Sequence, residues 1–204
     1  MTQAPGLRER KKEATRRALT RTAMRMAVER GWDAVRVEDI AAEVGVSTRT
    51  FNNYFASKEE AVIAGSFDRA ERARAALAAR PAGEPLWEAV TNALAGIMAA
   101  EEHEIGPVAA AHIKLVMGHP ALAAQQLRFE REAVATLSTA IGERVGTDPD
   151  TDPFPRLAAA VALAATRSAV EHWAGRRPGT PMAEAVRAAL SRVTIDPAGP
   201  RNSR

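Results

Sequence analysis

The sequence of 204 residues contains no cysteine, few aromatic residues and no long hydrophobic run. The lack of cysteine excludes a disulfide scaffold, a thiolate metal site and a cysteine nucleophile. Aromatic residues make up 4% of the chain, whereas alanine supplies 45 residues, nearly half of the hydrophobic fraction. Because alanine is the strongest helix former and strands favour β-branched and aromatic residues, the composition argues against an all-β fold.

Targeting segments and enzyme motifs are also missing. The N-terminus has no apolar stretch like that of a secretory signal, and the longest uncharged segments, such as 89–100 and 115–127, are too short to span a bilayer. We therefore expect a cytoplasmic protein without a membrane partner. The chain has no Gly-x-Ser-x-Gly, Walker loop, Gly-x-Gly-x-x-Gly or His-Glu-x-x-His, so we expect no enzymatic activity, no cofactor and no metal site.

Positive charge is concentrated near the N-terminus. Residues 1–30 carry nine Arg or Lys and three Glu, a net charge of +6, whereas residues 59–204 carry a net charge of −2. A basic segment on a nearly neutral body indicates a polyanionic partner, either nucleic acid or an anionic membrane surface. The apolar face of residues 8–30 is mainly alanine with Leu19 and Met26, which makes insertion into a membrane the weaker interpretation.

Apolar periodicity, with prolines at first-turn positions, predicts an all-α fold of about nine helices. The expected helices are 8–30, 37–44, 48–54, 58–80, 85–103, 106–117, 120–145, 154–174 and 181–193. Residues 196–204 lack periodicity and are expected to form a disordered tail.

The segment 37–58 has the pattern of a helix-turn-helix. Gly45 follows a short helix that has one apolar face. A sharp turn after a helix needs a left-handed backbone conformation, which glycine adopts without steric strain. Ser47 is the expected N-cap of the second helix, and Ser57 with Glu60 forms a capping box at the start of the third. In the second helix Phe51 and Phe55 point inward, which leaves an outer face of Thr48, Arg49, Asn52 and Asn53.

These exposed residue types are suited to reading DNA. Arginine binds guanine and asparagine binds adenine, both through paired hydrogen bonds in the major groove. The alternative interpretation is a helical hairpin with a purely structural role. Such a hairpin would not require a polar helix end beside a basic helix.

The run from Gly31 to Ala61 reads GWDAVRVEDIAAEVGVSTRTFNNYFASKEEA. It resembles the N-terminal domain of TetR-family transcriptional regulators, over roughly residues 8–65. The matching positions are Trp32, Ile40-Ala41, Gly45-Val46-Ser47, Tyr54-Phe55 and Ser57-Lys58-Glu59. Arg36 departs from the pattern, because it stands where the family often has a capping Thr or Ser, and we expect it to meet a phosphate instead.

The resemblance implies a double-stranded DNA operator and a DNA-binding domain over residues 1–57. On the groove-facing side of the recognition helix it places Ser47, Thr48, Arg49, Asn52 and Asn53. Tyr54 and Lys58 would touch phosphates. From the N-terminal arm, the DNA backbone or minor groove would be reached by Arg8, Arg10, Lys11 and Lys12.

The resemblance also implies that residues 58–195 form a helical effector-binding and dimerisation domain. Small residues at helical spacing in 154–174 and 181–193 permit close packing, and we expect a homodimer through these two helices, with intramolecular packing as the alternative. A small-molecule effector of unknown identity is expected. Core packing is the alternative for each of the large residues that are candidates for its pocket: Trp87, Met98, His112, Met117, Phe129, His172 and Trp173.

Together these features predict a homodimeric repressor of a palindromic operator that a small molecule releases. The alternatives are a helical activator, a ligand-independent DNA-binding protein and, least favoured, a membrane-surface protein.

Overall fold

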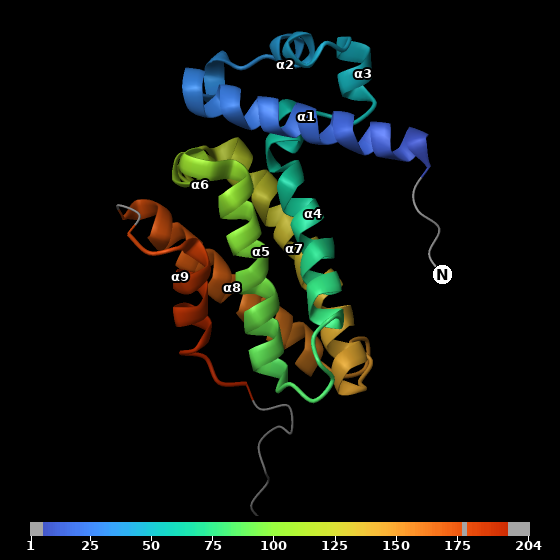
Figure 1. Ribbon diagram of the computed structural model, residues 1–204, viewed down its shortest axis with the longest axis vertical. Helices are drawn as coiled ribbons and strands as arrows, with labels where there is room; N and C mark the ends of the chain where they lie inside the picture. The colour runs from blue at the N-terminus through green and yellow to red at the C-terminus, as the bar shows by residue number, and fades with distance from the viewer. Residues whose placement is uncertain (1–5, 177–178, 196–204) are drawn as a thin grey trace, which may run out of the picture. The chain divides into compact units, whose positions relative to one another are not determined.

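The computed structural model describes residues 6–176 and 179–195. These residues form helices and connecting turns (Figure 1), which confirms the predicted all-α class. The predicted tail, residues 196–204, lies outside the described residues. The helices are α1 (Leu7–Arg30), α2 (Val37–Val44), α3 (Thr48–Asn52), α4 (Lys58–Ala78), α5 (Leu86–Ile105), α6 (Ala109–Gly118), α7 (Pro120–Val145), α8 (Phe154–Gly175) and α9 (Met182–Leu190), with 3-10 turns at Trp32–Ala34 and Gly106–Val108.

Helix boundaries differ from the prediction mainly at three places. Helix α3, the predicted recognition helix, ends at Asn52, because the amide of Asn53 donates to the carbonyls of Arg49 and Thr50 and tightens the last turn. The segment expected to open a helix at 106 is a 3-10 turn, Gly106–Val108, that contains a proline in its first turn. Helix α9 ends at Leu190 instead of 193.

The chain divides into two compact units by its internal contacts. The first unit comprises Met1–Ser66 with Leu115–Gln126, and the second comprises Phe67–Lys114 with Leu127–Arg204. The domain boundary predicted between residues 57 and 58 falls at the start of α4, whereas the division between the units falls inside this helix. Helix α4 is therefore shared by both units.

In the first unit, α1, α2 and α3 enclose a small core (Figure 1). Leu19 of α1, Ile40 of α2 and Phe51 of α3 are each fully buried. The turn between α2 and α3 depends on Gly45, whose backbone is left-handed at φ 78° and ψ 30°, and whose amide donates to the carbonyls of Ala41 and Ala42. The predicted Gly45 turn is confirmed.

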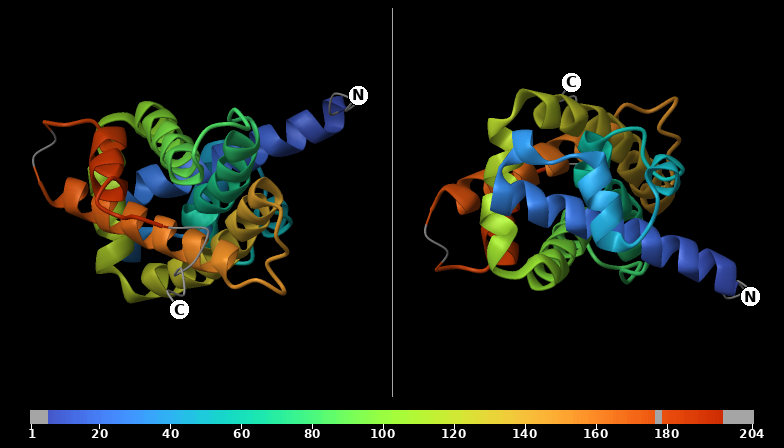
Figure 2. Two further views of the ribbon diagram at one scale, coloured as in Figure 1. Left: turned by 90° about the horizontal axis from the view of Figure 1, so that it is seen from below. Right: turned by 90° about the horizontal axis from the view of Figure 1, so that it is seen from above.

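In the second unit, α9 packs against both α5 and α8 (Figure 2). Side-chain hydrogen bonds fix both ends of α9. The indole of Trp87 donates to the carbonyl of Leu190 at 2.9 Å, and the carboxylate of Glu102 accepts from the amide of Met182 at 2.8 Å. The indole of Trp173 donates to the carbonyl of Thr180 just before α9, at 2.8 Å.

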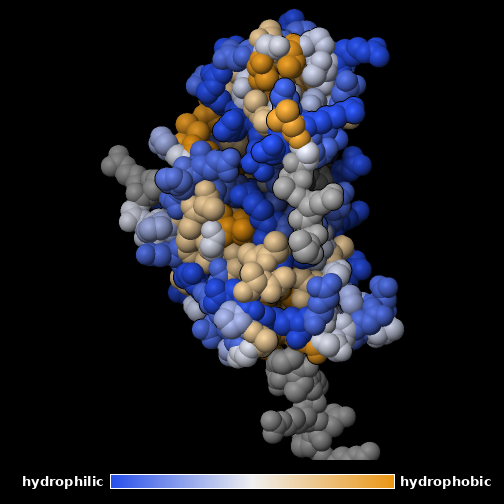
Figure 3. All heavy atoms as spheres, turned by 45° about the vertical axis from the view of Figure 1, so that its right-hand side comes forward, coloured by the Kyte–Doolittle hydropathy of each residue, from blue (hydrophilic) through white to orange (hydrophobic). Residues whose placement is uncertain are grey.

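Alanine forms much of the core of the second unit, together with a few larger residues such as Leu94, Ile141 and Leu190. The face shown in Figure 3 is largely hydrophilic, with a pale patch of weakly hydrophobic residues. Among the described residues, no helix combines the length and the apolarity that crossing a membrane requires.

We expect Gly45→Ala to lower the free energy of unfolding by about 1–2 kcal/mol, because a side chain strains the left-handed backbone. Gly65→Ala is the matched control in the same unit. Gly65 lies inside α4, and an added methyl there meets no atom within 4 Å. This second change should raise stability by up to about 1 kcal/mol. Urea unfolding followed by circular dichroism measures both, and equal effects of the two substitutions would contradict the assigned turn.

Candidate DNA-binding surface

Helix α3 is held from its start by a side-chain cap. The Ser47 hydroxyl accepts a hydrogen bond from the amide of Thr50 at 3.1 Å, as predicted, and it lies 2.9 Å from the Thr50 hydroxyl. Because Ser47 is committed to the cap, it has less freedom to contact DNA than its exposed position suggests. Phe51 is buried beneath the helix, with its ring centroid 5.6 Å from that of Phe55.

The opposite face of α3 is polar and solvent-exposed. Arg49, Asn52 and Asn53 are exposed, and Thr48 is half-buried. In the part of the chain that the structure describes, the side chains of Arg49, Asn52 and Asn53 form no hydrogen bond or ion pair. Their donors and acceptors are therefore available to an external partner, at the place where the sequence predicts base contacts.

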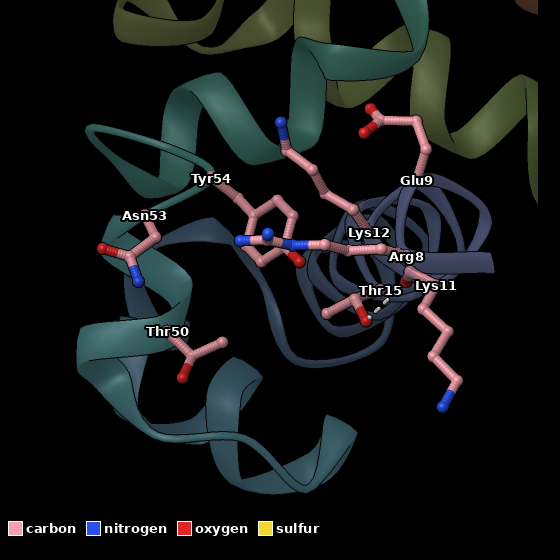
Figure 4. Close-up of a pocket in the computed structure, with 8 residues that line it drawn as sticks. All are labelled: Arg8, Glu9, Lys11, Lys12, Thr15, Thr50, Asn53 and Tyr54. Atoms are coloured by element: carbon pink, nitrogen blue, oxygen red, sulfur yellow. Dashed lines mark hydrogen bonds between the residues drawn. The ribbon is translucent and has the colours of Figure 1, made fainter. Parts of the chain in front are cut away.

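A groove of about 580 Å³ lies between the first turns of α1 and the end of α3 (Figure 4). In the view of Figure 4 the side chain of Arg8 points toward the end of α3, where Tyr54 lies, while Lys11 points to the other side. Three cations and one carboxylate line the groove, so its charge is positive. The lining residues are Arg8, Glu9, Lys11, Lys12, Thr15, Thr50, Asn53 and Tyr54.

The basic residues expected to reach DNA from the N-terminal arm lie within the predicted helix 8–30, and the structure confirms that helix. Leu7 already belongs to α1, so Arg8, Arg10, Lys11 and Lys12 are carried on its first two turns, all of them exposed. The helix fixes their spacing, which an extended arm would leave variable. Farther along α1, acidic partners offset part of the positive charge: Arg17 pairs with Glu13 at 2.8 Å.

Lys58, predicted to touch a phosphate, is the first residue of α4 and is half-buried. Its ammonium donates to the carbonyls of Trp32 and Val35 at 3.2 and 2.9 Å, and it lies 4.3 Å from the centre of the Trp32 ring. An ammonium has three donors, so these two bonds leave one N–H for a phosphate.

The starts of α2 and α4 differ in how they are capped. Arg36 precedes α2 in an extended conformation, is exposed and provides no side-chain cap, which fits its departure from the family pattern. Before α4, the Ser57 hydroxyl accepts from the amide of Glu60 at 3.2 Å, as predicted. The Glu60 carboxylate reaches back to the amide of Ala56 at 2.7 Å, one residue before the cap.

The seven candidates for an effector pocket lie in different surroundings. Met98, Phe129 and Trp173 are buried, and Trp87 is half-buried; both indoles are used to hold α9, as described above. Met117 is 48% exposed, and His172 lies on the surface of α8. Among the seven, His112 combines burial with an unpartnered polar atom, its Nε2.

His112 is electrostatically unusual. Its removal from water, with a further contribution from the nearby Arg69 cation, lowers the pKa of its imidazole from 6.5 to about 4. The ring is consequently neutral at physiological pH. Burial without a partner is costly for a polar atom, so His112 is a candidate for contact with a bound molecule.

Several structurally important contacts were not anticipated from the sequence. The His119 ring packs on Trp32, with centroids 5.5 Å apart, and its Nε2 lies 3.7 Å from a carboxylate oxygen of Asp33. Arg69 pairs with Glu101, and Arg144 donates to the carbonyls of Arg80 and Glu84. Each pair is far apart in sequence, and no local pattern signals such contacts.

A capped α3 with an unpaired polar face beside a basic groove defines a helix-turn-helix DNA-binding protein. Residues 19–64 match the family model for bacterial regulatory proteins of the tetR family, and residues 84–196 match the model for the MftR C-terminal domain. The HTH-type transcriptional regulator TcmR of Streptomyces glaucescens is 36% identical over 174 residues, which are 83% of this chain and 77% of TcmR. The chain belongs to the TetR family and is a DNA-binding transcriptional regulator.

Solved structures share the fold. The fatty acid degradation regulator FadR of Bacillus halodurans aligns with a TM-score of 0.58 and 16% identity over 93% of this chain and 95% of that chain. FadR of Thermus thermophilus, a TetR-family repressor solved in complex with lauroyl-CoA, aligns with a TM-score of 0.50 and 23% identity over 89% and 97%. At these identities the likeness concerns the fold alone.

The lowered pKa of His112 predicts a specific loss of stability in acid. Between pH 6.5 and 4 the unfolded chain binds a proton on this residue and the folded chain does not, so the free energy of unfolding falls as the pH falls. The full contribution is about 3 kcal/mol, and it levels off below the folded pKa. His112→Asn should remove this slope, whereas His172→Asn, at an exposed site, should keep it. Chemical unfolding across this pH range tests the difference, and equal slopes in wild type and His112→Asn would refute it.

Proposed function

We propose that the chain is a homodimeric repressor that binds a palindromic double-stranded DNA operator and is released by a small molecule. The observation that carries the DNA-binding part is the unpaired, exposed face of α3 beside the basic groove of α1. Arg49, Asn52 and Asn53 are of the types that discriminate bases in the major groove. Sequence-independent contacts to phosphates come from a second group of residues. This group comprises Arg8, Arg10, Lys11, Lys12, Arg36, Tyr54 and the remaining N–H of Lys58.

The exposed face of α8 supports the homodimer. Leu157 is 58% exposed, and farther along the same helix Ala160, Val161, Ala164 and Ala165 are half-buried or exposed. On α9 the apolar stripe Met182, Val186 and Leu190 is buried within the chain, which leaves Ala185 and Ala189 partly accessible. Small residues allow close helix approach, and a two-fold axis would set two recognition helices about 34 Å apart, one turn of DNA.

Release by a ligand is supported by the path of α4. This helix carries Lys58, which holds the segment before α2, and Arg69, which lies near the buried His112. A ligand that shifts α4 in the second unit therefore acts on the same helix whose first residue, Lys58, holds the segment before α2. Such a shift changes operator affinity only if the ligand binds one conformation more tightly than the other. The Thermus thermophilus FadR, which shares the fold, is a repressor solved with bound lauroyl-CoA.

The decisive experiment for DNA recognition is the double variant Arg49→Ala/Asn53→Ala. The binding site is first selected from random DNA with the wild-type protein. The double variant should lose about 1–3 kcal/mol of discrimination for each of the two bidentate contacts removed, about 2–6 kcal/mol in total, which is at least about thirtyfold in affinity for the selected site. Fluorescence anisotropy against a scrambled fragment measures the ratio.

Lys12→Gln is the matched control for that experiment. Loss of a phosphate contact should weaken binding to all DNA alike and reduce the slope of log affinity against log salt by about 1. If the double variant prefers the selected site as strongly as the wild-type protein does, the assigned base contacts are disproved. Placing the selected site over a promoter in a purified transcription reaction then distinguishes a repressor from an activator.

The proposed dimer predicts that Ala164→Glu yields a monomer. The substitution places a carboxylate on the exposed face of α8, where a partner helix would have to bury it. Ala75→Glu, at an exposed position of α4, is the control and should leave the oligomeric state unchanged. Light scattering coupled to size exclusion measures the mass, and a dimeric Ala164→Glu variant would exclude this interface.

A further inference from the structure

Three helices bring charged and polar side chains into the interior of the second unit. Arg69 of α4 donates through Nη2 to Oε1 of Glu101 on α5, and the side chains are 27% and 12% exposed. His112 of α6 is 8% exposed and close enough to Arg69 for the guanidinium to disfavour its protonation. Arg69, Glu101 and His112 are called the polar triad below.

The polar triad is not satisfied by the protein itself. Arg69 Nε, Glu101 Oε2 and His112 Nε2 are each buried and without a hydrogen-bond partner among the described residues. Arg72 Nε, one turn farther along α4, is in the same condition. Buried polar atoms almost always have partners in native proteins, and a group of four on three adjoining helices indicates that a further molecule supplies them.

The charges and donors define the chemistry of that molecule. Arg69 and Glu101 offset each other's charge and the imidazole of His112 is neutral, so the Arg72 guanidinium, one turn along α4, leaves a net charge of +1 that one negative charge on the ligand balances. The free Nε–H groups of Arg69 and Arg72 suit a carboxylate, and Glu101 Oε2 can accept from a hydroxyl. One turn away on the same helices lie buried Ile97, Met98 and Ala109, which favour an apolar ligand body.

We infer that the polar triad binds the acidic group of a small, mainly apolar organic acid. This inference rests on the proposed function, in which a small molecule releases the operator, and it names the chemical class of that molecule. The alternative occupant is ordered water, which can satisfy the same atoms. Water would give no preference between an acid and an uncharged analogue, and this difference can be measured.

The test compares acids with their uncharged amides. The probes are decanoate with decanamide and 2-naphthoate with 2-naphthamide, titrated calorimetrically into the full-length protein at millimolar concentration. At least one acid should bind about tenfold more tightly than its amide, as expected for one charge-assisted contact in a buried site. The same acid should shift the ¹⁵N resonance of His112 Nε2, which a purely structural role of the residue would not predict.

Two variants make the test specific. Arg69→Met/Arg72→Met/Glu101→Gln removes both guanidinium groups and the carboxylate together, so no buried charge is left uncompensated, and it should bring the acid-to-amide ratio close to one. Arg74→Met is the matched control, because Arg74 lies on the same helix but is exposed and paired with Glu71. It should keep the wild-type ratio. Circular dichroism verifies that each variant is folded, and the His112 resonance in the wild type provides a measurement that needs no variant.

The outcomes separate this inference from the proposed function. Equal binding of acid and amide, binding of neither acid, or the same loss in Arg74→Met would overturn the polar triad as an acid site. Binding to selected DNA is measured on the same preparation without ligand. If the protein prefers the acid but does not bind DNA, the proposed function is refuted and the acid site stands. If the protein binds DNA but does not prefer the acid, the acid site is refuted and the proposed function stands.

Discussion

The arrangement of the DNA-binding unit depends on the ammonium group of Lys58. It hydrogen-bonds the carbonyls of Trp32 and Val35 and lies over the Trp32 ring, so one side chain at the start of α4 fixes the segment that joins α1 to α2. A cation over an indole is stabilised by the negative face of the ring. His119 packs on the same indole. The direction of α2, and with it the position of α3, follows from this cluster.

Local residue patterns predicted this unit well because the signals lie close together in sequence. Gly45 provides the left-handed turn after α2, Ser47 caps α3, and Ser57 caps α4. Phe51 and Phe55 are four residues apart on a helical face, and both are buried. Each inference needs no more than one turn of chain. The helix predicted over the basic residues 8–30 is likewise present, as α1 from Leu7 to Arg30.

The second unit was less predictable for a physical reason. Large side chains in an alanine-rich body can fill the core, fix a helix end or line a site, and composition does not distinguish these roles. Trp87 and Trp173 donate to carbonyls 103 and 7 residues away, whereas His172 is exposed. The polar triad draws one residue from each of three helices. Its members have no fixed spacing, so only the folded structure brings them together.

The division of the chain has an evolutionary consequence. Residues 115–126, at the junction of α6 and α7, belong to the first unit and carry His119, although they are encoded between the two stretches of the second unit. The chain therefore crosses between units three times, each time inside a helix. A recombination that exchanges only the first 66 residues replaces Trp32 and leaves His119 facing a foreign neighbour. Replacement of the first unit as a module thus requires that two separate stretches of the gene change together.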